Sequence, residues 1–185
     1  MLALAFIEDF AIVDVAAGRV PWLAVALPSA WSPREKVGRT FAEIHAPVAD
    51  KRLLMAAGGA LLRLACTEPR WERFVWTVTP HPRLHALPCH LDPAGWQYAL
   101  DAGALPTLAW FRTERQTFVP LPDQGQALFL IQVDVRPLAA VIDSATRAAR
   151  LHAAIGSMSD AVIAYRGLGA IREPLLRWLA TQAAP

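Results

Sequence analysis

The stretch from residue 107 to residue 119 restricts the possible folds of this chain more than any other. Its ends are aromatic and β-branched, which favours a strand, but its centre is the polar run Arg112-Thr113-Glu114-Arg115-Gln116-Thr117. Strand alternation places Arg112 and Glu114 on one face and Arg115 and Thr117 on the other. Burying a carboxylate beside a guanidinium is costly unless the two are paired. The run therefore indicates either a polar functional cluster inside a sheet or a hairpin with one solvated face.

Apolar periodicity and turn residues predict the other strands. Two β-prone runs separated by Ala17-Gly18-Arg19 predict a first hairpin, and Leu121-Pro122-Asp123-Gln124-Gly125 predicts the turn of a second. Strands are expected at residues 6–15, 22–27, 74–79, 107–119 and 127–136. The chain should therefore contain an antiparallel sheet.

Helix starts are predicted where capping residues precede apolar periodicity. Ser32 and Glu35 predict a capping box, and Asp50 predicts the cap of a helix over residues 51–64, although Gly58-Gly59 weakens that helix. Asp143 or Ser144 should cap a helix that reaches about residue 165, and a last amphipathic helix is expected at residues 171–180. Residues 80–93, with three histidines and four prolines, are predicted to be a loop.

The order of these elements is two strands, a helical middle, three strands and C-terminal helices. This order favours an α+β fold: a PAS-like antiparallel sheet with central helices and C-terminal helices, in a single domain over residues 1–185. A fold of this kind holds ligands between the central helices and the inner face of the sheet.

Composition excludes several classes of protein. The chain is 55% hydrophobic and 18% charged, which indicates a large buried core, an apolar pocket or a partner surface. Its net charge of +2 and scattered arginines indicate no nucleic-acid surface, and its two cysteines do not support a disulfide framework. No apolar run is long enough to span a bilayer, and the first ten residues meet acidic groups too early for a signal peptide. We therefore expect a cytoplasmic protein.

Histidines are the candidate metal ligands. His81, His85, Cys89 and His90 carry zinc-binding groups, but their spacing fits no standard zinc site, and the alternative is a loop whose imidazoles face water or cap backbone groups. His45 ends a helical segment in the part of the chain that a PAS-like fold places against its pocket. It is either a satisfied core histidine or the axial ligand of a five-coordinate heme.

Four segments, taken in order, form a combination that is specific although each part alone is weak. They are Glu8-Asp9-Phe10; Pro28-Ser29-Ala30-Trp31 with Glu35-Lys36-Val37-Gly38-Arg39; Ile44-His45-Ala46-Pro47-Val48; and Arg112-Thr113-Glu114-Arg115-Gln116-Thr117 with Leu121-Pro122 and Val135-Arg136-Pro137-Leu138. Together they resemble the heme-dependent oxidative N-demethylase family, whose heme subunit oxidises dimethylamine-type secondary amines.

The resemblance implies a PAS-like fold that binds b-type heme (heme b) and receives electrons from a separate flavin and iron–sulfur reductase. It implies reductive activation of O₂, oxidation of an N-methyl group and release of formaldehyde. The residues expected to serve this chemistry are Glu114, Thr117 and Arg112 as catalytic groups, with Glu114 binding the substrate ammonium; His45 as the axial ligand of the iron, with His81 and His85 as alternatives; and Arg115, Arg136, Lys36 and Arg39 as cofactor-binding cations.

Three hypotheses follow. The first is a small amine oxygenase subunit that works with O₂ and a reductase subunit or domain. The second is a heme-binding sensor or structural subunit of the same fold without turnover, and the third is a heme-free PAS-like module that binds a small molecule. The apolar composition fits a reductase partner or a homodimer, and neither a membrane nor a nucleic acid is expected as a partner.

Overall fold

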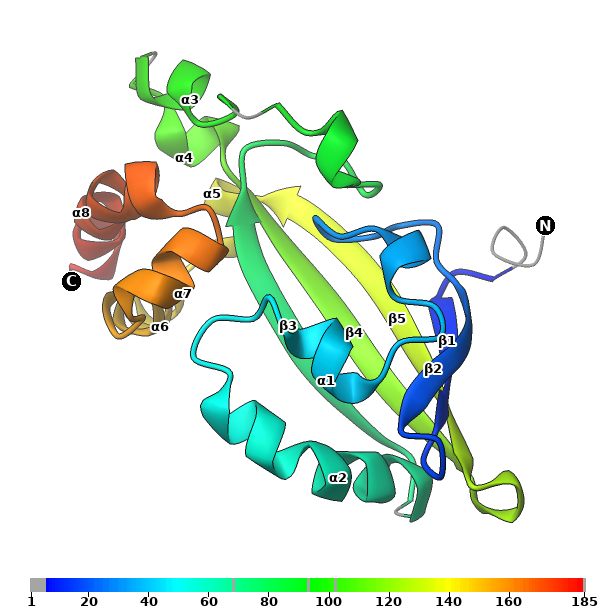
Figure 1. Ribbon diagram of the computed structural model, residues 1–185. Coiled ribbons are helices and arrows are strands. Elements are labelled where there is room, and N and C mark those ends of the chain that lie inside the picture. Colours follow the sequence, from blue (N-terminus) through cyan, green and yellow to red (C-terminus); the bar gives the residue numbers. More distant parts are fainter. Residues whose placement is uncertain (1–5, 68, 93, 102, 185) are drawn as a thin grey trace. The chain divides into compact units, whose positions relative to one another are not determined.

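The computed structural model describes residues 6–67, 69–92, 94–101 and 103–184. Five strands form one antiparallel sheet in the order β2-β1-β5-β4-β3 (Figure 1). The strands are β1 (Asp9–Asp14), β2 (Arg19–Ala24), β3 (Trp71–Thr79), β4 (Trp110–Leu121) and β5 (Gln126–Pro137). The predicted α+β class is confirmed, and a strand occurs in each of the five predicted regions, although β2 begins at Arg19, which was predicted to lie in the turn. The PAS-like assignment stays a prediction.

Helices occupy the middle and the end of the described chain. They are α1 (Phe41–His45), α2 (Arg52–Thr67), α3 (Gln97–Asp101), α4 (Leu105–Leu108), α5 (Leu138–Val141), α6 (Ala145–Gly156), α7 (Asp160–Tyr165) and α8 (Arg172–Ala183), with 3₁₀ turns at Pro33–Glu35, Pro88–His90, Pro122–Gln124 and Gly169–Ile171. None of the described helices is long and apolar enough to cross a membrane. The predicted loop over residues 80–93 contains one of the 3₁₀ turns, and its last residue, Pro93, lies outside the described residues.

The chain divides into two compact units, and the prediction of a single domain stays a prediction. The first unit consists of Met1–Val75, Leu84–Leu91 and Thr113–Asp134, and the second of Trp76–Arg83, Asp92–Arg112 and Val135–Pro185. Strands β3, β4 and β5 contribute residues to both units.

In the first unit the N-terminal hairpin continues the sheet. Strand β1 pairs antiparallel with β2 and, on its other side, with β5 from Asp9 opposite Ile131 to Asp14 opposite Gln126. An aromatic row crosses the sheet, because the rings of Trp71, Phe118 and Phe129 stack with centroids 4.3 and 4.6 Å apart. The core beside this row consists of Val13, Ala65, Cys66 and Ala127, with Leu62, Phe118 and Phe129 packed against it.

Helix α2 is continuous through Gly58-Gly59, and the two glycines differ in their surroundings. A Cβ on Gly58 would lie 2.9 Å from Phe41 Cδ1, so the glycine allows Phe41 of α1 to pack against α2. Gly59 is exposed, and a Cβ there would only approach Arg63 Nη1 at 3.6 Å. Gly58 therefore allows close packing between α1 and α2, and this packing outweighs the low helix propensity of the two glycines.

Four local predictions are corrected. Ser32 makes no side-chain cap bond, and the capping box instead joins Thr40 and Glu43 at the start of α1. Asp50 has a left-handed φ of 51°, and the helix after it begins at Arg52. Residues 107 and 108 belong to α4, because Pro106 fits the first turn of a helix. The helix predicted to reach residue 165 is two helices, and Ser159 caps the second of them.

The second unit is a helical layer with its own apolar core. Ser144, one of the two predicted caps, accepts from the backbone N–H of Arg147 and starts α6. Helix α6 packs against α8. The largest fully buried side chains of this core are Val78, Leu138, Ile155, Leu168, Ile171, Leu175 and Leu179.

Candidate functional site

The polar run of β4 forms a hydrogen-bonded cluster in the first unit. The Glu114 carboxylate accepts from the Ser29 hydroxyl through Oε1 and from the Gln116 amide through Oε2, the latter at 2.7 Å. Gln116 Oε1 in turn accepts from Arg73 Nε at 2.8 Å. Gln116 is 8% exposed and Thr117 is 3% exposed, so β4 does not form the solvated face that one interpretation predicted.

Ser29 reaches Glu114 because its backbone is held on two sides. The buried Asp9 carboxylate accepts from the N–H groups of Ala26 and Leu27 at 2.7 and 2.8 Å, which fixes the chain just before Ser29. Ser29 itself forms a parallel bridge with Ala86. Asp9 thus positions the segment that carries Ser29, and Ser29 contacts Glu114 of the polar run, although these residues are distant in sequence.

His45 is half-buried at the end of α1. Its Nδ1 lies 2.8 Å from the carbonyl oxygen of Phe41 and, because a carbonyl only accepts, Nδ1 carries the proton. Among the described residues, none is hydrogen-bonded to Nε2, and this nitrogen carries the lone pair of the neutral ring. Metal-ligating histidines commonly donate their other ring N–H in this way.

The electrostatics of the first unit connect His45 with the Glu114 cluster. Burial lowers the pKa of His45, and the positive charges of Arg73 and Lys36 add to that shift, while the hydrogen bond to the Phe41 carbonyl opposes it. Burial also lowers the pKa of Arg73, and the charge of Glu114 opposes that shift. Arg73 is therefore within electrostatic reach of both His45 and Glu114.

Three of the predicted cofactor-binding cations also lie in the first unit. Lys36 donates through Nζ to the Ile44 carbonyl at 3.0 Å, next to His45. Arg39 is exposed and pairs with Glu43 at 3.1 Å. Arg115 pairs with Glu8 at 3.5 Å. Of the three, Lys36 is the one that contacts the residue preceding His45 in the chain.

Other predicted site residues belong to the second unit. Arg112 is buried and donates through Nη1 to the Arg83 carbonyl at 2.9 Å. His81 has a pKa lowered by burial and by the charges of Arg112 and Arg83, and its Nδ1 is buried without a hydrogen bond. Arg136 is exposed.

The histidine loop does not form a zinc site in the described part of the chain. No group of three or more metal-ligating side chains occurs there. His85 contacts the Ala26 carbonyl through Nδ1 at 2.7 Å, and its ring lies 5.5 Å from that of His90. This contact is the backbone-capping role that the alternative interpretation predicted for the loop.

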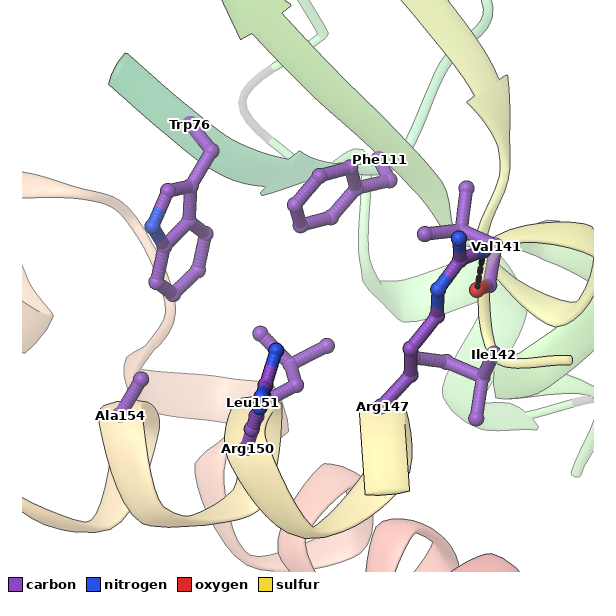
Figure 2. Close-up of a pocket in the computed structure, with 8 residues that line it drawn as sticks. All are labelled: Trp76, Phe111, Val141, Ile142, Arg147, Arg150, Leu151 and Ala154. Carbon is purple, nitrogen blue, oxygen red and sulfur yellow. Dashed lines mark hydrogen bonds between the residues drawn. The ribbon is translucent and has the colours of Figure 1, made fainter. Parts of the chain in front are cut away.

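An open recess of about 360 Å³ lies in the second unit (Figure 2). Trp76 and Phe111 stand on one side of it, and Leu151, Arg150 and Ala154 of α6 stand on the other. Arg147 donates to the Val141 carbonyl at 3.4 Å and pairs with Asp143. The lining contains no carboxylate, imidazole or thiol, so the recess offers an apolar surface but no acid–base or metal chemistry.

Sequence reasoning missed three parts of the Glu114 cluster. Ser29 and Gln116 belong to segments that carry the family resemblance, but no role was predicted for them. Arg73 immediately precedes the strand predicted at residues 74–79. A signal for Gln116 was present, because alternation puts it on the Glu114 face. Arg73 had no such signal, since its partner is 43 residues away in sequence.

The sheet and the Glu114 cluster define an α+β protein with a polar cluster on strands β3 and β4, and the half-buried His45 lies on helix α1. The chain matches the family model described as "Haem-dependent oxidative N-demethylase, alpha subunit-like" over residues 1–176, and it belongs to that family. The resemblance stated from the sequence is therefore confirmed. The description makes haem (heme) the cofactor of the family and names an alpha subunit, which indicates a protein that acts with other subunits.

Proposed function

We propose that this chain is the heme-binding catalytic subunit of an oxidase that removes methyl groups from small secondary amines. Family membership supports the heme and the reaction class, and the single observation that carries the proposal for this chain is the state of His45. Its Nδ1–H is committed to the Phe41 carbonyl at 2.8 Å, and Nε2 keeps its lone pair.

The chemistry of His45 and its neighbours supports a heme site in the first unit. An imidazole must be neutral to bind iron, and burial together with the charges of Arg73 and Lys36 lowers the pKa of His45 and so favours its neutral form. In this proposal His45 would hold the iron through Nε2, and Lys36 would be a cation for the carboxylates of the cofactor. When bound, heme b supplies the reductive activation of O₂.

Glu114 is the proposed binding group for the substrate. A small alkylamine is a cation at neutral pH, like a lysine side chain with a pKa of about 10.4. A carboxylate within a water-poor site attracts such a cation more strongly than one in bulk water. The geometry supports this role, because one donor occupies each oxygen of Glu114 and leaves lone pairs for further N–H groups.

The overall reaction has a simple balance. Dimethylamine, O₂, two electrons and two protons give methylamine, formaldehyde and water. One oxygen atom enters formaldehyde as an N-methyl C–H bond is oxidised and the C–N bond breaks, and the other leaves in water. The electrons come from a separate flavin and iron–sulfur reductase in this proposal.

An absorption spectrum and a turnover assay test the proposal. Protein produced with added heme should show a Soret band that shifts with dithionite and is lost in His45→Ala but retained in His85→Ala. With NADPH, a surrogate reductase and dimethylamine, the wild type should release formaldehyde and Glu114→Gln should not. Colourless wild-type protein would refute the heme role, whereas a Soret band without formaldehyde would favour the non-catalytic sensor.

A further inference from the structure

We propose that Gln116, Ser29 and Arg73 are positioning residues that hold the Glu114 carboxylate in one orientation for a cationic ligand. This inference rests on the proposed function, because the ligand is the substrate ammonium. The three residues do not contact the ligand in this role and act only through Glu114.

Gln116 is suited to its place by the polarity of its amide. A guanidinium can only donate hydrogen bonds, and an ionised carboxylate can only accept them. A side chain between Arg73 and Glu114 must therefore accept at one end and donate at the other. Gln116 does this, since Oε1 accepts from Arg73 at 2.8 Å and Nε2 donates to Glu114 at 2.7 Å. The amide can face only one way, so the position of Arg73 orients Glu114.

Ser29 holds the other oxygen of the same carboxylate. Its hydroxyl donates to Oε1 while Gln116 donates to Oε2, so the two donors restrict rotation of the carboxylate from both sides. A carboxylate offers about four lone-pair sites, and two are filled here. One lone-pair site on each oxygen remains for a further donor.

Arg73, which begins the hydrogen-bond chain to Gln116 and Glu114, is also held in place. Arg73 Cζ lies 5.9 Å from the centroid of the Phe118 ring, which is itself stacked between Trp71 and Phe129. The orientation of Glu114 is thus set by packed aromatic rings through two hydrogen bonds, rather than by a flexible surface contact. Preorganisation of this kind lowers the entropy that a ligand must remove on binding.

The test is a titration of the protein with dimethylammonium, in which binding is measured by calorimetry and by changes in the heme spectrum. Gln116→Met is nearly isosteric and removes both bonds of the bridge, so the dissociation constant of the cation should rise by about tenfold or more. Ser29→Ala should weaken binding in the same direction, and Ser29→Thr, which keeps the hydroxyl, should restore it.

Two controls separate positioning from general damage. Gln126→Met removes another amide–carboxylate contact, Gln126 Nε2 to Asp14 Oδ2 at 3.3 Å, and should leave the affinity unchanged. 2-Propanol, a neutral molecule of similar shape, should bind equally weakly to all variants. A merely structural role of Gln116 would change heme content, and this content should stay at the wild-type level.

Two results would overturn the inference in distinguishable ways. If the wild type binds dimethylammonium and Gln116→Met binds it within twofold, the positioning role is wrong and the proposed function stands. If the wild type binds no dimethylammonium, with or without heme, the amine function and the positioning role both fail.

Discussion

The Nδ1 atom of His45 lies 2.8 Å from the carbonyl oxygen of Phe41, one turn earlier in the same short helix. The two rings also pack together, with centroids 4.1 Å apart. The orientation and the tautomer of His45 therefore depend on the position of Phe41, and the position of Phe41 depends on the helix that it packs against.

Gly58→Ala should disturb His45 from a distance. The new Cβ would lie 2.9 Å from Phe41 Cδ1, and the ring would have to move. Overpacking costs about 1–3 kcal/mol, of which alanine's better helix propensity offsets up to about 1 kcal/mol. We expect lower stability in urea denaturation and weaker heme binding. Gly59→Ala is the matched control and should raise stability by up to about 1 kcal/mol without changing heme binding.

The stability of the heme-free protein should depend on pH through His45. Its pKa in the folded protein is below the ordinary value of 6.5, mainly because of burial. The unfolded chain therefore takes up a proton first as the pH falls, and the free energy of unfolding should decrease from about pH 6.5 down to the folded pKa. Urea titrations at several pH values should show a smaller decrease for His45→Gln than for the wild type. Equal decreases would contradict a lowered pKa of His45 in the folded protein.

Thr40→Ala should destabilise the helix that carries His45. Thr40 and Glu43 form a full capping box, in which the Thr40 hydroxyl accepts from Glu43 N at 3.3 Å and donates to Glu43 Oε2 at 2.8 Å. Loss of such a cap costs about 1 kcal/mol, and we expect that loss in the unfolding free energy together with weaker heme binding. Ser32→Ala is the control, because Ser32 makes no side-chain cap bond and its replacement should change stability by less than about 0.5 kcal/mol.

Asp9→Asn should loosen the backbone that carries Ser29. The Asp9 carboxylate accepts from two backbone N–H groups, and an asparagine can offer only one accepting atom to them. Leaving a buried donor without a partner costs about 1–3 kcal/mol. Chemical denaturation should show this loss, whereas Asp143→Asn, which removes an exposed ion pair with Arg147, should cost less than about 1 kcal/mol.

Local rules were sufficient for some parts of the molecule. Alternation on β4 correctly placed Glu114 and Gln116 on one face, since their side chains are hydrogen-bonded to each other. The caps show the limit of such rules. Ser32-Pro33 has a strong capping signal, but the capping box forms at Thr40 because the chain continues as a helix only from Phe41.

Long-range contacts could not be predicted from local patterns. Strand alternation says which residues share a face, but not that β5 would pair with β1 or that Arg73 of β3 would reach Gln116. Gly58-Gly59 illustrates the same point, because the sequence cost of a mid-helix glycine is visible while the Phe41 ring that requires it is not. The candidate site was therefore predicted as a set of residues and not as a network.

The contact between Ser29 and Glu114 joins residues that are 85 positions apart in the chain. Contacts of this separation close large loops, and they form late because chain entropy must be lost before they are made. A nascent chain that ends before β4 contains His45 but no Glu114 for Ser29 to contact. Assembly of the carboxylate cluster therefore depends on closure of the sheet, whereas the contact between His45 and Phe41 is local to α1.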